Sequence, residues 1–265
     1  MRRRPDILLN TAEVELWPAW LLRARGNGDA RILARANHVL RRKHDGRYLA
    51  AVLPQGLMPL LPRLSREAGV EAALDALDAF DNGRHVPTDA ALEPHGLLQR
   101  LDALGIDADD YADRTGLGIV AEPVALALAG FDRYRRPLWL QADAARAWLR
   151  MRAAASGDDV VLEAISGYRS HDYQLGIFER KRARGLGVAQ ILAVNAAPGY
   201  SEHHGGHALD IGTPGEPPAE ESFEATDAFA WLATHAPTHG FTLSYPRDNP
   251  HGIVYEPWHW RHGPA

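Results

Sequence analysis

The sequence predicts an α+β fold in which a small antiparallel sheet with flanking helices follows a mainly helical N-terminal region. Late in the chain, short apolar segments typical of strands are joined by short connections, which favour antiparallel pairing. Earlier in the chain, apolar residues recur at helical spacing between clear stops. The 265 residues suffice for one large or two small domains. Because the sequence changes in character after about Gly118, we expect a helical region of unknown role over 1–118 and a second domain over 119–265.

Three helices are expected in the N-terminal region, each followed by a residue that ends helices. We expect them over residues 29–42 with Gly46 as the stop, from Ser65 to Asn82-Gly83, and from Thr88 or Gly96 to Gly105. Four histidines of this region lack the spacing of metal ligands and are interpreted as surface or capping residues: His38, His44, His85 and His95. No catalytic cluster is visible in this half of the chain.

The second half shows a helix that leads into a buried strand and then into a loop rich in polar residues, which is a scaffold on which a site can be built. The helix is expected over 142–155, where Ser156-Gly157 ends it, and the strand over 160–165. Further strands are expected around 207–211, 241–245 and 252–255, with a helix over 227–235.

Composition excludes several classes of protein. The formal charge of -5 at pH 7 lacks the basic excess of nucleic-acid-binding proteins, so nucleic acid is not an expected partner. The chain has no cysteine, which excludes disulfides, thiolate nucleophiles and cysteine-ligated metals. Any metal ligands must therefore be His, Asp or Glu side chains.

No export signal or membrane span is visible in the sequence. Arg2, Arg3 and Arg4 resemble the positive start of a signal peptide, but Pro5-Asp6 interrupts the apolar stretch that should follow. Apolar runs are far shorter than the roughly 20 residues of a membrane helix. The chain as given is expected in the cytoplasm, or in the periplasm or outside the cell if a signal was removed or export is non-classical.

The segment from Ser201 to Asp210 carries three imidazoles and two carboxylates. If Gly206 begins a strand, Asp210 points to one side of it, and the paired glycines allow His203 to fold back toward that side. Zinc binds neutral imidazole nitrogen and carboxylate oxygen and, in catalytic sites, keeps one position for water. His203 and Asp210 are therefore candidates for two of three protein ligands.

The run from Glu256 to His259 offers the third ligand beside a carboxylate. Pro257 disfavours a helix, so we expect an extended run with a local bend that directs both side chains into one cleft. His259 would then bind the metal, while Glu256 would remain unligated and take a proton from the metal-bound water. Arg169, which follows the strand over 160–165, would stabilise the oxyanion or bind a substrate carboxylate.

Each of these residues also has a purely structural interpretation. A His-rich segment can be a surface loop, and we expect His204 and His207 to be surface residues rather than ligands. Arg169 and Glu256 can pair with other charges, and Trp258 can be a core or cleft-wall aromatic. The conjunction favours a site, because three separated segments hold the residue types that one hydrolytic zinc centre needs.

Three motifs resemble those of the VanY-type D-alanyl-D-alanine carboxypeptidases, which belong to the LAS group (lysostaphin, D-Ala-D-Ala metallopeptidases and the sonic hedgehog signalling domain). They are Ser-Gly-Tyr-Arg-Ser at 166–170, Ser-x-His-x-x-Gly-x-Ala-x-Asp at 201–210 and Glu-Pro-Trp-His at 256–259. The resemblance covers about 119–265, and the segment before it has no recognised counterpart.

The resemblance implies a LAS-like fold and one Zn²⁺ per chain. It makes His203, Asp210 and His259 the zinc ligands, Glu256 the catalytic base and Arg169 the residue that stabilises the transition state. Positions expected to line the substrate pocket are Ser166, Tyr168, Gln174, Ser201 and Trp258.

The resemblance also implies a substrate, the peptidoglycan stem peptide, from which the protein would remove the C-terminal D-alanine. L,D-carboxypeptidase and endopeptidase activities remain alternatives because relatives with the same motifs differ in a few loop contacts. A non-catalytic metal-dependent binding module is an alternative of another class, but it would need neither Glu256 nor Arg169.

The N-terminal region could anchor the protein to the wall, bind a partner or act as a lid.

Overall fold

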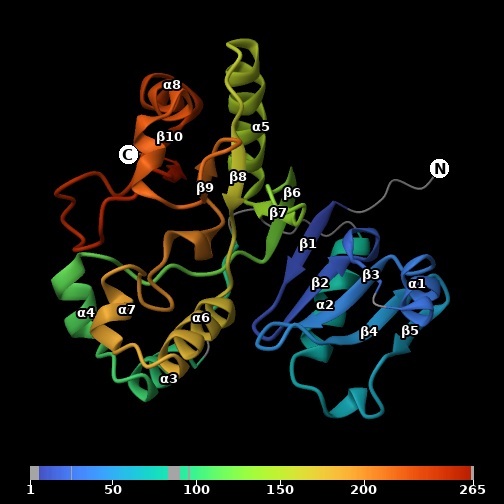
Figure 1. Cartoon of the computed structure of the whole chain (residues 1–265). Coiled ribbons are helices and arrows are strands. Elements are labelled where there is room, and N and C mark those ends of the chain that lie inside the picture. Colours follow the sequence, from blue (N-terminus) through green and yellow to red (C-terminus); the bar gives the residue numbers. More distant parts are fainter. Residues whose placement is uncertain (1–5, 25, 83–89, 95, 264–265) are drawn as a thin grey trace. The chain divides into compact units, whose positions relative to one another are not determined.

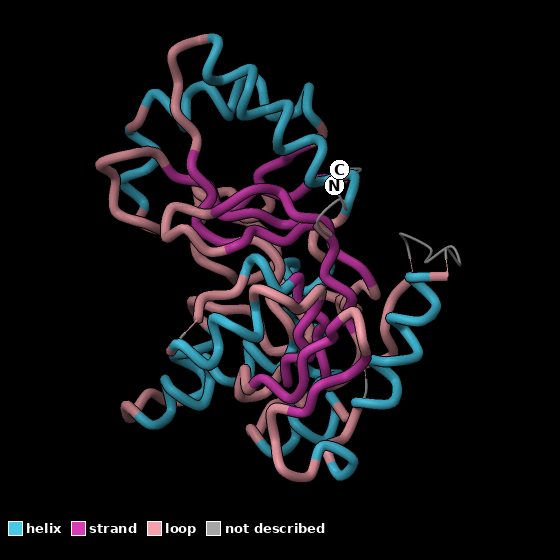
Figure 2. Tube along the Cα trace, turned by 90° about the vertical axis from the view of Figure 1, so that its right-hand side faces the viewer, coloured by secondary structure: helices cyan, strands magenta, loops and turns pink. Residues whose placement is uncertain are grey.

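The computed structural model describes residues 6–24, 26–82, 90–94 and 96–263 (Figure 1). The chain forms two compact units, of which the first comprises Met1–Glu93 with Pro123–Leu128 and the second comprises Pro94–Glu122 with Ala129–Ala265. The boundary thus differs from the expected one after residue 118, because residues 94–118 belong with the second unit. Both units combine strands with helices (Figure 2), which confirms the α+β class.

The first unit is built on an antiparallel sheet, so the expectation of a mainly helical N-terminal region is wrong. Its strands occur in the order β5-β4-β3-β2-β1-β6. Their bounds are Ile7–Asn10 for β1, Val14–Pro18 for β2, His38–Arg42 for β3, Tyr48–Leu53 for β4, Gly56–Pro59 for β5 and Ala125–Phe131 for β6, of which residues 125–128 belong to this unit. Its helices are α1 (Asn27–Leu33) and α2 (Val70–Asp81), with short 3-10 turns η1 (Ala19–Leu21) and η2 (Leu64–Arg66).

The helical spacing over 29–42 was misleading because it joined α1 to β3. In β3, Val39 packs with Ala51 in one apolar cluster, whereas Leu40 packs with Ala50 in another. Both faces of the sheet are covered, which removes the period-two alternation that marks a half-buried strand. Gly46, with a φ of 69°, is part of the β3–β4 turn rather than a helix stop.

The other N-terminal predictions have mixed outcomes. The helix expected from Ser65 forms as α2, beginning at Val70, and the third forms as α3 (Leu97–Ala103). His38 is buried in β3 rather than lying at the surface, while His44 is exposed. The predictions that involve Gly83, His85, Thr88 and His95 fall outside the described residues.

The second unit contains a four-stranded antiparallel sheet in the order β10-β11-β9-β8, with bounds Glu163–Ser166 for β8, Ala208–Gly212 for β9, Phe241–Leu243 for β10 and His259–His262 for β11. Strand β7 (Pro137–Leu140) follows the end of β6. The helices are α3, α4 (Ala108–Thr115), α5 (Ala142–Gly157), α6 (His171–Ala183), α7 (Val188–Leu192) and α8 (Asp227–His235), and the 3-10 turns are η3 (Glu202–Gly205), η4 (Glu221–Ala225) and η5 (Ala236–His239). The expected helices over 142–155 and 227–235 and the strands that became β8, β9 and β10 are confirmed.

The strand expected over 252–255 does not form. Ile253 is instead buried in an apolar cluster with residues of α3, α4, α6 and α7, including Leu101, Tyr111 and Phe178. The carbonyl of Ile253 accepts a hydrogen bond from the Asn249 side-chain amide at 2.7 Å. Packing and a side-chain hydrogen bond therefore hold this segment in place of a strand ladder.

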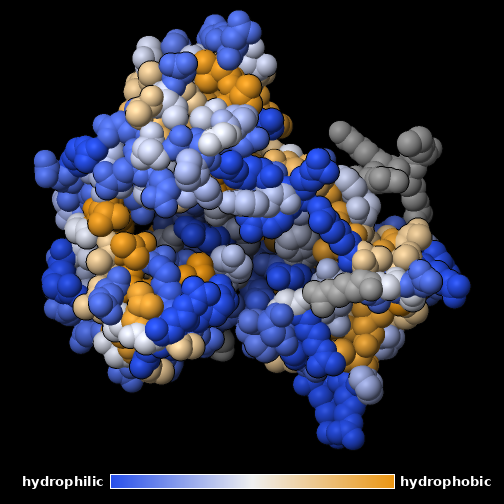
Figure 3. Space-filling model, viewed as in Figure 1, coloured by the Kyte–Doolittle hydropathy of each residue, from blue (hydrophilic) through white to orange (hydrophobic). Residues whose placement is uncertain are grey.

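Among the described residues, no helix is both long and apolar enough to cross a bilayer. On the face shown in Figure 3, apolar side chains form small patches among hydrophilic ones.

Candidate active site

Three segments that lie far apart in the sequence meet at one end of the second unit's sheet. Strand β9 carries Asp210, and its partner strand β11 places His259 directly opposite Asp210 in the register. On the other side, Ser166 at the end of β8 also pairs with Asp210. The loop over 167–170 therefore begins beside the two candidate ligands.

His203 reaches the same point because the chain reverses just before β9. It lies in the 3-10 turn η3, which is closed by Gly206 at a φ of 73°, and the Gly206 N–H donates to the His203 carbonyl at 3.2 Å. Glycine adopts this left-handed conformation without the strain that a side chain would introduce. The expected role of the glycines in folding His203 back is confirmed.

His203, Asp210 and His259 form a buried cluster in which one potential ligand atom of each lies within 4.8 Å of the others. The Gly167 carbonyl accepts a hydrogen bond from His203 Nδ1 at 2.8 Å, so the proton is on Nδ1 and the Nε2 lone pair faces the cluster. His203 is only 1% exposed, and its Nε2 makes no hydrogen bond within the described chain. A buried nitrogen lone pair directed at a carboxylate and a second imidazole fits a divalent metal ion.

The ionisation states of the first two ligands also suit a metal. Burial, assisted by the charge of Arg169, lowers the pKa of His203 to about 4, so its imidazole is neutral at pH 7. Burial alone would raise the pKa of Asp210, but His203 and His259 outweigh it and hold that pKa far below its usual value. Neutral imidazole and ionised carboxylate are the forms that bind a metal.

Glu202 is a residue of the site that sequence reasoning missed. Its Oε2 lies 2.9 Å from His259 Nε2, while His259 Nδ1 lies 3.2 Å from Asp210 Oδ1. Burial would lower the pKa of His259, yet hydrogen bonds to these two carboxylates raise it to about 10. A carboxylate that hydrogen-bonds a metal-ligating imidazole fixes the orientation and tautomer of that ring. The position of Glu202 beside a predicted ligand was the only signal available.

Glu256 lies next to the cluster without being part of it. Its Oε2 is 3.8 Å from His259 Nδ1, and the His259 N–H donates to the Glu256 carbonyl at 3.0 Å. This turn is the bend expected around Pro257, and β11 begins immediately after it. Burial raises the pKa of Glu256 to about 7 against the opposing charges of His259 and Arg169. A carboxyl group with this pKa suits a general base near neutral pH.

Arg169 is fixed in place through its backbone. Its N–H donates to the His203 carbonyl at 3.2 Å, and its own carbonyl accepts from His204 Nδ1 at 2.7 Å. Within the described residues the guanidinium makes no hydrogen bond or ion pair, and its Nε is buried. A buried donor without a protein partner is available to a ligand.

The cluster forms one wall of a cleft of about 310 Å³. The expected site residues in its lining are Arg169, Gln174, Ser201, His203, Asp210, Glu256, Trp258 and His259, joined by Lys181, Asn195 and Tyr245, which were not expected. Gln174 donates through Nε2 to the Ala196 carbonyl at 3.0 Å, whereas its buried Oε1 has no hydrogen bond among the described residues. Gln174 therefore offers the cleft an acceptor.

Ser166 and Tyr168 were expected in the pocket but are not among the residues that line this cleft. The Tyr168 hydroxyl donates to Glu122 Oε2 at 2.6 Å, and Glu122 Oε1 accepts the N–H of His171 at 2.8 Å. Tyr168 thus ties the loop before α6 to the segment that precedes β6. The Tyr168 side chain stabilises this loop because its hydroxyl hydrogen-bonds the buried Glu122 carboxylate.

His204 was expected at the surface but is fully buried. Besides its bond to Arg169, its Nε2 accepts the N–H of Gly199 at 3.1 Å. It is not a member of the metal-binding cluster, as expected. His207 is partly exposed and lies 3.4 Å from Asp143 Oδ1 through its Nε2.

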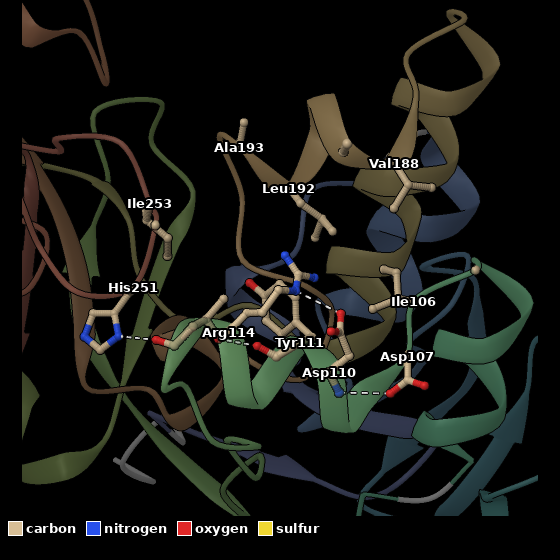
Figure 4. A pocket seen from close by; sticks show the side chains of 14 residues that line it. Ile106, Asp107, Asp110, Tyr111, Arg114, Val188, Leu192, Ala193, His251 and Ile253 are labelled. Atoms are coloured by element: carbon tan, nitrogen blue, oxygen red, sulfur yellow. Dashed lines mark hydrogen bonds and ion pairs between the residues drawn. The ribbon is translucent and has the colours of Figure 1, made fainter.

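A second concavity, of about 560 Å³, is lined by α4, α7 and the segment 251–253. Figure 4 shows Tyr111, Asp110 and Arg114 of α4 facing Val188 and Leu192 of α7, with the Asp110–Arg114 ion pair at 2.8 Å. Ile253 lines both this concavity and the cleft beside the His203–Asp210–His259 cluster.

Comparison with known proteins relates the site-bearing part of the chain to one family. The family model VanY, described as D-alanyl-D-alanine carboxypeptidase, matches residues 137–265. The protein named "Putative carboxypeptidase YodJ" from Bacillus subtilis is 34% identical over 141 residues, which are 50% of this chain and 49% of that protein. The bifunctional D-Ala-D-Ala dipeptidase and D-Ala-D-Ala carboxypeptidase VanXYC of Enterococcus gallinarum is 32% identical over 146 residues, covering 53% of this chain and 75% of the relative. The chain thus spans about half the length of the first of these relatives.

Two solved structures are also similar to part of the chain. The LdcB LD-carboxypeptidase is 31% identical with a TM-score of 0.47, covering 50% of this chain and 64% of that one. A mutant of the vancomycin resistance D,D-pentapeptidase VanY, solved in complex with Zn(II), is 28% identical with a TM-score of 0.40, covering 47% of this chain and 73% of that one.

Proposed function

Because the chain belongs to the VanY family of D-alanyl-D-alanine carboxypeptidases, we propose that it is a zinc-dependent carboxypeptidase that removes the C-terminal D-alanine from peptidoglycan stem peptides. The observation that carries this proposal is the buried His203–Asp210–His259 cluster. Beside it in the same cleft lie Glu256, which is not part of the cluster, and Arg169, whose guanidinium has no partner among the described residues. A cluster with only a structural role would not require a general base and a free cation next to it.

His203 Nε2, one oxygen of Asp210 and His259 Nδ1 would hold the metal. Zinc bound by two imidazoles and a carboxylate supplies Lewis acidity, which polarises a carbonyl and lowers the pKa of water. Glu202 keeps the His259 ring in the orientation in which Nδ1 faces Asp210. Glu256 would not bind the metal, since its carboxylate oxygens are not part of the cluster.

The remaining residues position the peptide and move the proton. The Glu256 carboxylate would accept the proton of the attacking water and later deliver it to the amine of the departing D-alanine. Arg169 would stabilise the negative charge on the carbonyl oxygen or bind the terminal carboxylate. The Oε1 of Gln174, which has no hydrogen bond among the described residues, would accept an N–H of the peptide backbone.

Product analysis tests this function directly. We expect the zinc-loaded protein to release free D-alanine from a stem pentapeptide ending in D-Ala-D-Ala, detected by mass spectrometry. Cleavage of the tetrapeptide in preference to the pentapeptide would establish the L,D-carboxypeptidase alternative. Cleavage within a cross-linked peptide, or no cleavage of any peptide despite metal binding, would support the endopeptidase or the binding module respectively.

The replacement of Arg169 by Lys is expected to lower kcat/KM on the pentapeptide at least about tenfold, because one charge-assisted contact contributes about 1.5–3 kcal/mol. Lysine retains the charge but loses the planar donor pair of the guanidinium. Kinetics with the pentapeptide and its C-terminal amide divide the two roles. If Arg169 binds the carboxylate, wild type prefers the free acid and the variant discriminates less; equal cleavage of both peptides by wild type would exclude an exopeptidase. Arg184→Lys serves as the matched control, because Arg184 is exposed and directly follows the last residue of α6.

A further inference from the structure

The catalytic cleft contains a second cation besides Arg169. Lys181 lines the same cleft, on the helix that follows Arg169 in the chain. We propose that Lys181 binds a second carboxylate of the substrate, located upstream of the scissile bond, so that the protein prefers stem peptides in which this group is free over those in which it is amidated. This inference rests on the proposed function and adds a substrate feature to it.

The position of Lys181 follows from the geometry of α6. Gln174 and Lys181 are seven residues apart, or about two helical turns, so they lie on the same face of the helix. Phe178 between them is fully buried and packs α6 into the core of the second unit. The helix is therefore held in place while its cleft-facing side extends from Gln174 to Lys181.

Among the residues that the structure describes, Lys181 has no partner for its charge. Its ammonium group forms no hydrogen bond or ion pair with the residues that the structure describes, and burial lowers its pKa without an opposing carboxylate. The carboxylates of the cleft are directed elsewhere, since Asp210 and Glu202 contact His259 and Glu256 lies beside it. A partly buried cation without an anion favours an anionic ligand.

The spacing indicates which carboxylate Lys181 would meet. Two turns of helix correspond to about 10 Å, whereas an extended peptide advances about 3.3 Å per residue. A peptide that runs along α6 with its scissile bond near Arg169 and Gln174 would thus place a group about three residues upstream opposite Lys181. A peptide cut before its last residue would thus present to Lys181 a carboxylate carried by the third residue upstream of the scissile bond.

The neighbouring cation Arg182 does not share this environment. Arg182, the next residue along α6, is exposed and does not line the cleft. Arg182→Gln therefore changes the net charge of the same helix by the same amount as Lys181→Gln without altering the cleft. This pair of variants separates a specific contact from a general electrostatic effect.

The test compares two pentapeptides that differ only at the third residue upstream of the scissile bond, where one carries a free carboxyl group and the other the amide. We expect wild type and Arg182→Gln to favour the free acid by about tenfold in kcat/KM, as one charge-assisted contact allows. Lys181→Gln should reduce this ratio to below about threefold, and Lys181→Arg should restore it. Thermal melting of each variant establishes that its fold is intact.

Three results would overturn the inference. Equal cleavage of the two peptides by wild type would show that no residue of the protein binds the upstream carboxylate. Failure to cleave either peptide would instead reject the proposed function. If Lys181→Gln keeps the wild-type ratio, another residue is responsible. If Lys181→Gln instead loses discrimination between the pentapeptide and its C-terminal amide, Lys181 binds the terminal carboxylate and the upstream assignment is wrong.

Discussion

Replacing Glu256 by Gln is expected to reduce kcat on the stem pentapeptide by about 10²–10⁴-fold, the usual contribution of general acid–base catalysis. Glutamine has nearly the same shape but cannot accept the proton of water. Because Glu256 lies outside the His203–Asp210–His259 cluster, the variant should bind as much zinc as wild type. Steady-state kinetics and metal analysis of the same preparation measure both quantities.

Glu221→Gln provides the control for Glu256, because Glu221 is an exposed acidic residue paired with Arg247 at 3.6 Å. Its activity should match that of wild type. If Glu256→Gln keeps activity within about threefold of wild type, the loss is far smaller than expected, and another group must be the general base. Loss of zinc in this variant would instead make Glu256 a ligand.

The metal ligands carry the second large effect. We expect the wild-type protein to bind about one zinc ion per chain, and the His203→Ala, His259→Ala double variant to bind none and to lose all measurable activity. Removing two of three ligands leaves only Asp210 of the cluster, which cannot hold zinc on its own. Elemental analysis after dialysis against a weak chelator gives the stoichiometry.

Thermal unfolding provides a readout of zinc binding that does not depend on activity. A ligand that binds only the folded state raises the melting temperature, so zinc should stabilise wild type and leave the double variant unchanged. The exposed His44 supplies the control, since His44→Ala should respond to zinc as wild type does. Full zinc content in the double variant would refute the ligand assignment.

Much of the site was predictable because the chemistry of a zinc hydrolase restricts the residue types that it can use. With cysteine absent, only a few histidines and carboxylates had the required grouping. His203 and Asp210 lie within one short segment, and His259 is three residues from Glu256, so local spacing was informative. Glu202 was not predicted because its role depends on which way the turn η3 directs its side chain toward β11.

Lys181 and Tyr168 show that a residue's position in the sequence does not decide whether its side chain reaches the cleft. Sequence spacing placed Tyr168 beside Arg169, yet its hydroxyl is taken by Glu122, which is 46 residues away in the chain. Lys181 lies outside every motif and enters the cleft only because α6 packs against the core through Phe178. Contacts between distant segments decide such roles, and a single sequence does not record them.

The sequence by itself determined the α+β class, the position of α5 and α8, and the identity of the residues that could hold a metal, because these depend on local periodicity and on residue chemistry. Only the tertiary structure decided that the N-terminal region is a sheet and that residues 94–122 belong with the catalytic unit. The physical reason is that both faces of β3 are covered, by the clusters around Val39 and Leu40. A strand buried on both sides loses its alternating pattern, and burial on each side comes from segments that local spacing does not reveal.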